Sequence, residues 1–280
     1  MTSVAPPPRP PAVFVRRDAR NGLLWLKQSA AMFRARPLTW LLLVFTYYFL
    51  VVLAEIGPWP RVGALVAPLL KPVFAVGFLA AAWTQERGGA PRFEHLFRGF
   101  RSNLFALIPL GVFFFGGISV ALLATTLVDD GMLIALLSGT QRPSDEVLAG
   151  GRLQLAMLFG SVCALPTLLA MWFAPALVVF DDAGALRALG TSLRAAIANW
   201  RAVAVYGSLL FMFGGLLPVV VLSIGQLFGE TFAGVLALFV VAPYLIAFIA
   251  TLHISDYVSY RDIFHADEAV TPSERKIETD

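Results

Sequence analysis

The sequence is poor in charge, cysteine and histidine. Only 14% of its 280 residues are charged and 58% are hydrophobic, against about 25% and roughly 45 to 50% in ordinary soluble domains. This composition argues against a soluble globule. The single cysteine, Cys163, excludes a disulfide within the chain and a cysteine-cluster metal site. The three histidines form no recognisable catalytic constellation with a nucleophile or an acid, so we expect no enzymatic activity and no bound metal or cofactor.

The apolar residues gather in long blocks, each able to cross a hydrocarbon layer of ~30 Å at ~1.5 Å per residue. The fold class expected is therefore all-α, a polytopic integral membrane protein with six transmembrane helices. The predicted spans are Leu38–Ile56, Val62–Thr84, Leu104–Val128, Leu153–Phe180, Ala202–Leu227 and Phe232–Ile254.

The basic residues predict the orientation of these spans. Seventeen of the 21 lysines and arginines lie in the N-terminal segment, the tail and the two loops on the same side, and only three lie in the alternate loops. Because cytoplasmic loops carry the excess of lysine and arginine, both termini are predicted to be cytoplasmic. The basic cytoplasmic face is expected to lie against anionic lipid head groups. No motif for nucleic-acid binding is present.

The ends of the chain differ in composition from the spans. Residues 5–11 read APPPRPP, which favours a solvated polyproline conformation over a helix. We therefore expect a disordered, Pro/Arg-rich cytoplasmic tail over residues 1–18, a six-helix transmembrane domain over residues 19–264, and a disordered polar cytoplasmic tail over residues 265–280.

An amphipathic helix is predicted before each odd-numbered span. Their apolar positions are spaced as on one helix face, with basic residues on another: Leu23, Leu26, Ala30 and Phe33; then Phe93, Leu96, Phe97 and Phe100; then Leu186, Leu189, Leu193, Ile197 and Trp200. Such helices would lie flat at the inner membrane interface. Alternatively, they pack on the bundle as ordinary connecting helices.

Repeated sequence features indicate an internal repeat. The third and fifth spans both contain F-x-F-G-G, at 113–117 and 211–215, and each even span has a phenylalanine eight residues before an acid. The predicted architecture is three repeated units, each an interfacial amphipathic helix followed by a transmembrane hairpin. The three units have the same orientation, unlike the inverted repeats of many transporters.

Three short runs resemble those of a known family. WFAPAL at 172–177, NWRAVAVYG at 199–207 and YVSYRDIF at 257–264 are similar to runs in a family of proteobacterial six-helix inner-membrane proteins without an assigned activity. The resemblance covers about residues 19–264 and implies six helices and an inner-membrane address, with no catalytic residue to carry over. The proline-rich start and Lys71 depart from the family pattern. The repeated helix and hairpin is also similar to the membrane domain of some glycerophosphodiester phosphodiesterases, whose catalytic domain has no counterpart here.

Lys71 is the most unusual residue of the predicted spans. A charge about ten residues into a span costs ~2.5 to 3.5 kcal/mol on insertion scales. Glu55, near the outer end of the preceding span, is the nearest acid in sequence. Lys71 and Glu55 are therefore candidates for an outward-facing polar vestibule that holds an anion or a proton. The alternative is that Lys71 extends to the outer head groups without a function.

Three acids are predicted at the ends of the even spans. Glu86, Asp181 and Asp256 would meet the negative end of the helix dipole, which is unfavourable for a carboxylate. We expect arginines of the interfacial helices to compensate, for example Arg98 with Glu86 and Arg194 with Asp181. A proton or cation relay through these acids is an alternative to such structural clamps.

Two classes of function remain open. The first is a non-enzymatic scaffold, assembly or lipid-organising protein, which the interfacial helices and the shortage of buried charge favour. The second is a small-solute transporter or channel, which needs a polar path through the membrane and for which Lys71 is the main candidate residue.

Overall fold

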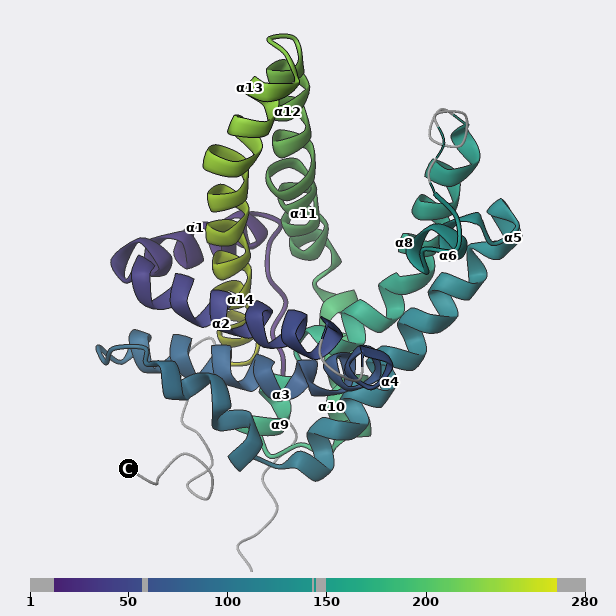
Figure 1. Cartoon of the computed structure of the whole chain (residues 1–280). Coiled ribbons are helices and arrows are strands. Elements are labelled where there is room, and N and C mark those ends of the chain that lie inside the picture. Colours follow the sequence, from purple (N-terminus) through teal and green to yellow (C-terminus); the bar gives the residue numbers. More distant parts are fainter. Residues whose placement is uncertain (1–12, 57–59, 143, 145–149, 266–280) are drawn as a thin grey trace, which may run out of the picture.

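The computed structural model describes residues 13–56, 60–142, 144 and 150–265, and the regular elements in these residues are all helices (Figure 1). Six helical segments are long and apolar enough to cross a membrane, as the sequence predicted. The elements are α1 Arg20–Ala35, α2 Pro37–Ile56, α3 Pro60–Glu86, the 3-10 helix η1 Phe93–Arg101, α4 Leu104–Ala124, α5 Thr126–Asp129, α6 Met132–Leu137, α8 Gly151–Trp172, α9 Ala174–Phe180, α10 Ala185–Ala198, α11 Trp200–Leu210, the π-helix η2 Phe211–Leu216, α12 Leu217–Gln226, α13 Glu230–Leu236, the π-helix η3 Ala237–Val241 and α14 Ala242–Phe264.

The long helices form three hairpins. Hairpin 1 consists of α2 and α3, hairpin 2 of α4 and α8 with α9, and hairpin 3 of the segments from α11 to α14. Figure 1 shows hairpins 2 and 3 diverging from a common base, so that α5 and α6 at one tip lie far from the α12–α13 turn at the other. Hairpins 2 and 3 therefore share one packed end and separate toward their tips, whereas α3 of hairpin 1 packs along α4.

Large apolar and aromatic side chains fill the shared end, which we call the hub. The hub takes residues from every hairpin and from the helices α1 and η1 that connect to them. Its largest fully buried side chains are Trp25, Trp40, Leu43, Phe78, Leu96, Leu107, Leu110, Phe173, Leu177, Phe180, Tyr257 and Tyr260. All seven residues of α9 are buried, which places this short helix at the centre of the hub.

A helix break positions α9 within the hub. Helix α8 ends at Trp172, and Pro175 lies at the start of α9, where a missing N–H does least harm. The backbone N–H of Phe173 at the break donates to the hydroxyl of Ser192 (3.0 Å), which donates in turn to the carbonyl of Leu169 (2.8 Å). One side chain of α10 thus serves both sides of the break.

The connecting helices α1 and η1 pack closely on the bundle through glycine. A Cβ atom added at Gly22 of α1 would lie 2.3 Å from the carbonyl oxygen of Ala202, and one at Gly99 of η1 would lie 1.9 Å from that of Val73. Because only glycine permits such approaches, the backbones of these helices touch their neighbours directly. Both helices are thus seated on the bundle, and their placement at the membrane interface stays a prediction.

The far part of hairpin 3 packs mainly on itself. Only 6% of the apolar stretch of Trp200–Gln226 and 17% of that of Glu230–Phe264 is buried inside the protein. Large apolar side chains such as Phe211 and Phe239 are 71% and 69% exposed. In a bilayer these surfaces face lipid or other membrane helices.

The N-terminal tail is shorter than the sequence suggested. Residues 1–18 were expected to be disordered, but residues 13–18 lie along the hub, where Phe14 packs edge-on against Phe264 and the Val15 amide donates to the carbonyl of Ile263 (2.9 Å). Phe14, which follows the proline-rich run, is partly buried against the hub. Residues 1–12 and 266–280 lie outside the described residues.

Helix α14 extends ten residues beyond the predicted end of the sixth span, from Ile254 to Phe264. Asp256 therefore lies inside a helix and not at its end, which corrects the prediction. The reason is the continued helical spacing of apolar residues, because Tyr257, Val258 and Ile263 are fully buried in the hub.

Candidate functional site

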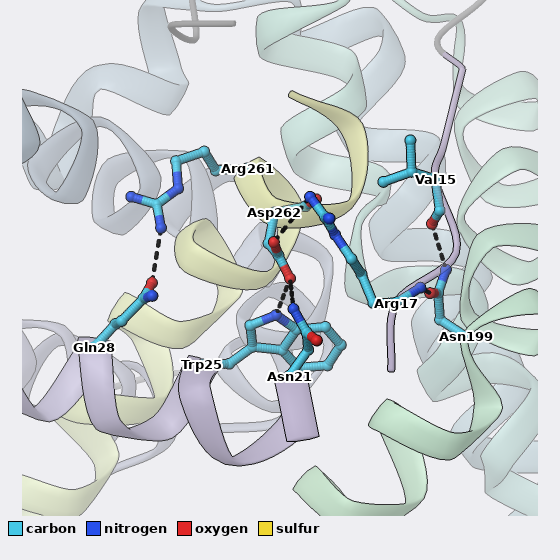
Figure 2. Close-up of polar contacts among 8 residues, drawn as sticks. All are labelled: Val15, Arg17, Asn21, Trp25, Gln28, Asn199, Arg261 and Asp262. Atoms are coloured by element: carbon cyan, nitrogen blue, oxygen red, sulfur yellow. Dashed lines mark hydrogen bonds and ion pairs between the residues drawn. The ribbon is translucent and has the colours of Figure 1, made fainter. Parts of the chain in front are cut away.

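The richest polar cluster surrounds Asp262, in the last turn of α14 (Figure 2). Its carboxylate accepts hydrogen bonds from the Trp25 indole N–H (2.8 Å) and the Asn21 amide (2.9 Å), and it pairs with the Arg17 guanidinium (3.1 Å). A carboxylate at a helix C-terminus is unfavourable by itself, so these three groups provide the needed compensation. They join α14 to α1 and to the N-terminal segment.

The N-terminal segment also caps the end of α14. Arg17 donates from Nε (3.0 Å) and Nη2 (2.7 Å) to the backbone carbonyl of Asp262. Asn199, between α10 and α11, holds the segment from the other side, because its amide donates to the carbonyl of Val15 (3.1 Å) and accepts from the Arg17 amide (2.6 Å), as Figure 2 shows. Residues 15–17 thus connect two ends of hairpin 3.

Glu86 obtains its compensation from α14. Its carboxylate accepts from the Tyr257 hydroxyl and pairs with Arg261, whose guanidinium also donates to Gln28 of α1 (2.7 Å). The sequence suggested an arginine partner for Glu86 and gave Arg98 as the example. The structure has an arginine partner, but it is Arg261. Arg261 reaches Glu86 because α14 continues beyond the predicted span.

Asp181, at the end of α9, likewise interacts with α14 and its C-cap. Its carboxylate accepts from the Tyr260 hydroxyl (2.6 Å) and lies 3.7 Å from His265 Nε2. The suggested partner, Arg194, bonds instead within its own helix, to the carbonyl of Gly190 (3.2 Å) and to Thr191. Arg194 is exposed on α10, and its side chain is directed along that helix.

Asp256 and His253 lie one turn apart on α14, before Asp262 in the chain. The His253 ring stacks on Phe78 of α3, with centroids 3.9 Å apart and the planes nearly parallel, and its edge faces Tyr47. Asp256 interacts electrostatically with Lys71 and Tyr206. Within the described residues no three His, Cys, Asp or Glu side chains gather as metal ligands would.

Lys71 projects from α3 toward α4. Its side chain is exposed, and its Nζ lies 4.1 Å from the centroid of the Phe114 ring, a cation–π contact. Asp256 and His253 of hairpin 3 act on it electrostatically. Lys71 therefore contacts hairpin 2 and interacts electrostatically with hairpin 3. The side chain of Glu55, its predicted partner, lies outside the described residues, so that pairing stays a prediction.

His95 fixes η1 to α3 and is almost fully buried, at 3% exposure. Its Nδ1 accepts from the Arg92 amide (2.7 Å), and its Nε2 lies 3.2 Å from the Thr84 hydroxyl, which itself donates to the carbonyl of Ala80 (2.8 Å). Nδ1 also lies 3.0 Å from the Arg92 carbonyl oxygen, so both ring nitrogens have hydrogen-bonding partners. Burial lowers the pKa of His95, and the charges of Arg98 and Arg92 lower it further.

A pH dependence of stability follows from the depressed pKa of His95. The unfolded chain binds a proton near the ordinary pKa of about 6.5, whereas the folded chain binds it only at lower pH. The free energy of unfolding should therefore decrease as the pH falls below about 6.5. Unfolding in detergent between pH 8 and pH 5 should show a smaller pH dependence for His95→Gln than for the wild type, and equal dependences would contradict this account.

The polar groups of the hub act as structural partners. Within the described residues, every buried side-chain nitrogen and oxygen has a hydrogen-bond partner. The sequence did not single out Asp262, Arg17, Tyr257, Tyr260 or Arg261. Positions 257, 260, 261 and 264 fall at helical spacing on one face of α14, and this continuation of the helical pattern was the signal that could have identified them.

One comparison with known proteins gives a match. A protein of Burkholderia thailandensis, named a probable inner membrane protein, is 30% identical over 261 residues, which are 91% of this chain and 95% of that protein. Neither a protein-family model nor a solved structure matches the chain. The alignment runs nearly end to end in both proteins, and six helices here are long and apolar enough to span a bilayer. The chain therefore belongs to the same family of multi-pass inner membrane proteins as the Burkholderia protein.

Proposed function

We propose that this protein is a non-enzymatic scaffold, assembly or lipid-organising protein of the inner membrane. The observation that carries this proposal is the contrast between the hub and the hairpins. Aromatic packing and the Asp262 cluster fix the hub, whereas the outer part of hairpin 3 exposes apolar side chains such as Phe211 and Phe239. A rigid base that holds separated apolar hairpins suits contact with lipids or with helices of other membrane proteins.

The proposal includes the orientation and the repeat. Both termini are cytoplasmic, and the basic hub side lies against anionic lipid head groups and binds no nucleic acid. Each hairpin with its preceding helix, α1, η1 or α10, forms one of three repeated units. The order of the elements supports the repeat, and the distribution of basic residues supports the orientation.

The absence of enzymatic activity also belongs to the proposal. Catalysis needs a polar group free to meet a substrate, whereas Glu86, Asp181 and Asp262 are engaged by tyrosine, tryptophan, arginine or histidine side chains of the same chain. These acids are therefore assigned to holding the hub together.

A transporter is the second candidate, and Lys71 is the observation that favours it. Lys71 of hairpin 1 interacts electrostatically with Asp256 of hairpin 3, which places two ionisable side chains inside membrane-spanning segments. Such residues often mark a pathway for ions or solutes.

Gene deletion with complementation separates the two candidates. Under the scaffold proposal, loss of the gene alters lipid composition or envelope stress and leaves solute uptake unchanged. A double variant at the exposed surface of hairpin 3, Leu238→Ala with Phe239→Ala, should fail to restore the phenotype, whereas Leu186→Ala, on the 86% exposed Leu186 of α10, should restore it. A specific uptake defect that Lys71→Met fails to restore would overturn the scaffold proposal and support transport.

A further inference from the structure

Lys71 carries a charge within the apolar part of α3. It follows Leu65, the first residue of that apolar stretch, by six positions, which corresponds to about 9 Å along a helix. The opposite end of the stretch, at Glu86, is fifteen positions away, or roughly 22 Å. Lys71 is therefore nearer to the beginning of this apolar stretch than to its end, and it lies two residues before Val73, which is part of the hub.

The position of Lys71 is fixed by a close crossing of α3 and α4. A Cβ atom added at Gly111 would lie 2.2 Å from the carbonyl oxygen of Leu69, so the two backbones touch two residues before Lys71. Three residues beyond Gly111, the Phe114 ring receives the ammonium group. The charge is thus held beside the junction of hairpins 1 and 2.

The protein compensates this charge only in part. Within the described residues, Lys71 forms no salt bridge and no hydrogen bond, and Asp256 and His253 act on it without direct contact. A cation–π contact contributes about 0.5 to 2 kcal/mol, less than the ~2.5 to 3.5 kcal/mol cost of a charge within a span. The three N–H donors of the ammonium group are free to bind an oxygen anion.

The surroundings of Lys71 select an amphiphile over a free anion. Leu65 and Val66 on α3, and Val112 and Phe115 on α4, are exposed apolar side chains on the two helices that meet beside Lys71. Acyl chains can cover such surfaces, and a lysine stem extends readily toward phosphate at the head-group level. A small soluble anion would gain nothing from the apolar surface.

We infer that Lys71 binds the phosphate of an anionic phospholipid at the junction of hairpins 1 and 2. The ammonium group donates to the phosphate oxygens while the acyl chains lie along α3 and α4. This site deepens the proposed lipid-organising role, on which it rests. It lies on the α4 side of α3, two residues before Val73, where Gly99 of η1 packs on the same helix.

The test is photo-crosslinking of the full chain in lipid nanodiscs. The probe is phosphatidylglycerol with a diazirine in its acyl chain, and labelled peptides are mapped by mass spectrometry. Label is expected in residues 60–75 and 104–120, and Lys71→Met should reduce it roughly tenfold, the effect of one lost charge-assisted contact. Lys71→Arg should retain the label. Lys27→Met is the matched control, because it removes the same charge from an exposed position on α1.

A substitution of Asp256 should change the lipid labelling in the opposite direction. Its carboxylate attracts Lys71 and repels phosphate, so Asp256→Asn should increase the labelling. Equal labelling of the wild type and Lys71→Met would overturn the inference. So would complete competition by inorganic phosphate, which would show a site for free anions. The labelling measures binding alone, so its failure is distinguishable from an unaltered lipid or stress phenotype in the deletion strain, which would refute the proposed function.

Discussion

Replacing Gly111 with valine is expected to separate hairpins 1 and 2 and to destabilise the protein severely. The Cβ atom of the new side chain would lie 2.2 Å from the Leu69 carbonyl oxygen and 2.7 Å from the Leu69 Cα and carbonyl carbon. These are backbone atoms of α3, which cannot turn aside as a flexible side chain could. We expect a loss at or above the upper end of the ~1 to 3 kcal/mol typical of overpacking, measured by unfolding in mixed detergent micelles.

Gly116→Val on the same helix is the matched control. A Cβ atom added at Gly116 meets nothing within 4 Å, so the same substitution there adds a side chain without a clash. The two variants have the same composition, and their sites are five residues apart on α4. If both unfold at the same denaturant concentration, the close crossing does not contribute to stability as the geometry requires.

These two glycines show that close helix contacts cannot be predicted from the sequence alone. Gly116 and Gly117 belong to the F-x-F-G-G motif that recurs in the fifth span, whereas Gly111 belongs to no repeated motif. Yet Gly111 lies at the crossing with Leu69, and Gly116 faces open space. The sequence shows which residues of a helix are small. Only the position of the neighbouring helix shows which of these small residues lies at the crossing.

The six spans could be predicted because lipid imposes a local requirement. Each span needs about 20 apolar residues in a row, and this property can be read without knowledge of any distant contact. The six candidate spans of the structure correspond to the predicted ones, with the largest difference at α14, where buried Tyr257 and Ile263 extend the helix into the hub. That extension is a tertiary effect, because these residues lie beyond the apolar run but are buried in the hub.

The partners of the acids could not be predicted for the same reason. Glu86 lies 12 residues before Arg98, and this nearness in sequence suggested the pair, but its observed partner Arg261 is 175 residues away. Lys71 was identified because a charge in an apolar run is visible locally. Its neighbour Phe114 was not, because that contact depends on the crossing of α3 and α4.

The second large effect is expected from Asp262→Ala. The substitution removes the hydrogen-bond acceptor of the Asn21 amide and of the Trp25 indole N–H, and Trp25 is only 1% exposed. It also leaves Arg17 without its counter-ion. An unsatisfied buried donor costs about 1 to 3 kcal/mol, and a broken buried ion pair costs more. Because the Arg17 and Asp262 side chains are 26% and 20% exposed, we expect a total near 3 kcal/mol, measured by the same unfolding assay.

Asp130→Ala supplies the control for the loss of an aspartate–arginine pair. Asp130 and Arg152 are 2.7 Å apart, closer than Asp262 and Arg17, but their side chains are 81% and 69% exposed. Water screens an exposed pair, so its loss should cost less than about 1 kcal/mol. Asp262→Ala should also release the N-terminal segment, and trypsin should then cut faster after Arg16 and Arg17. If the two variants have the same free energy of unfolding and the same rate of cleavage, apolar packing alone stabilises the hub and Asp262 does not contribute.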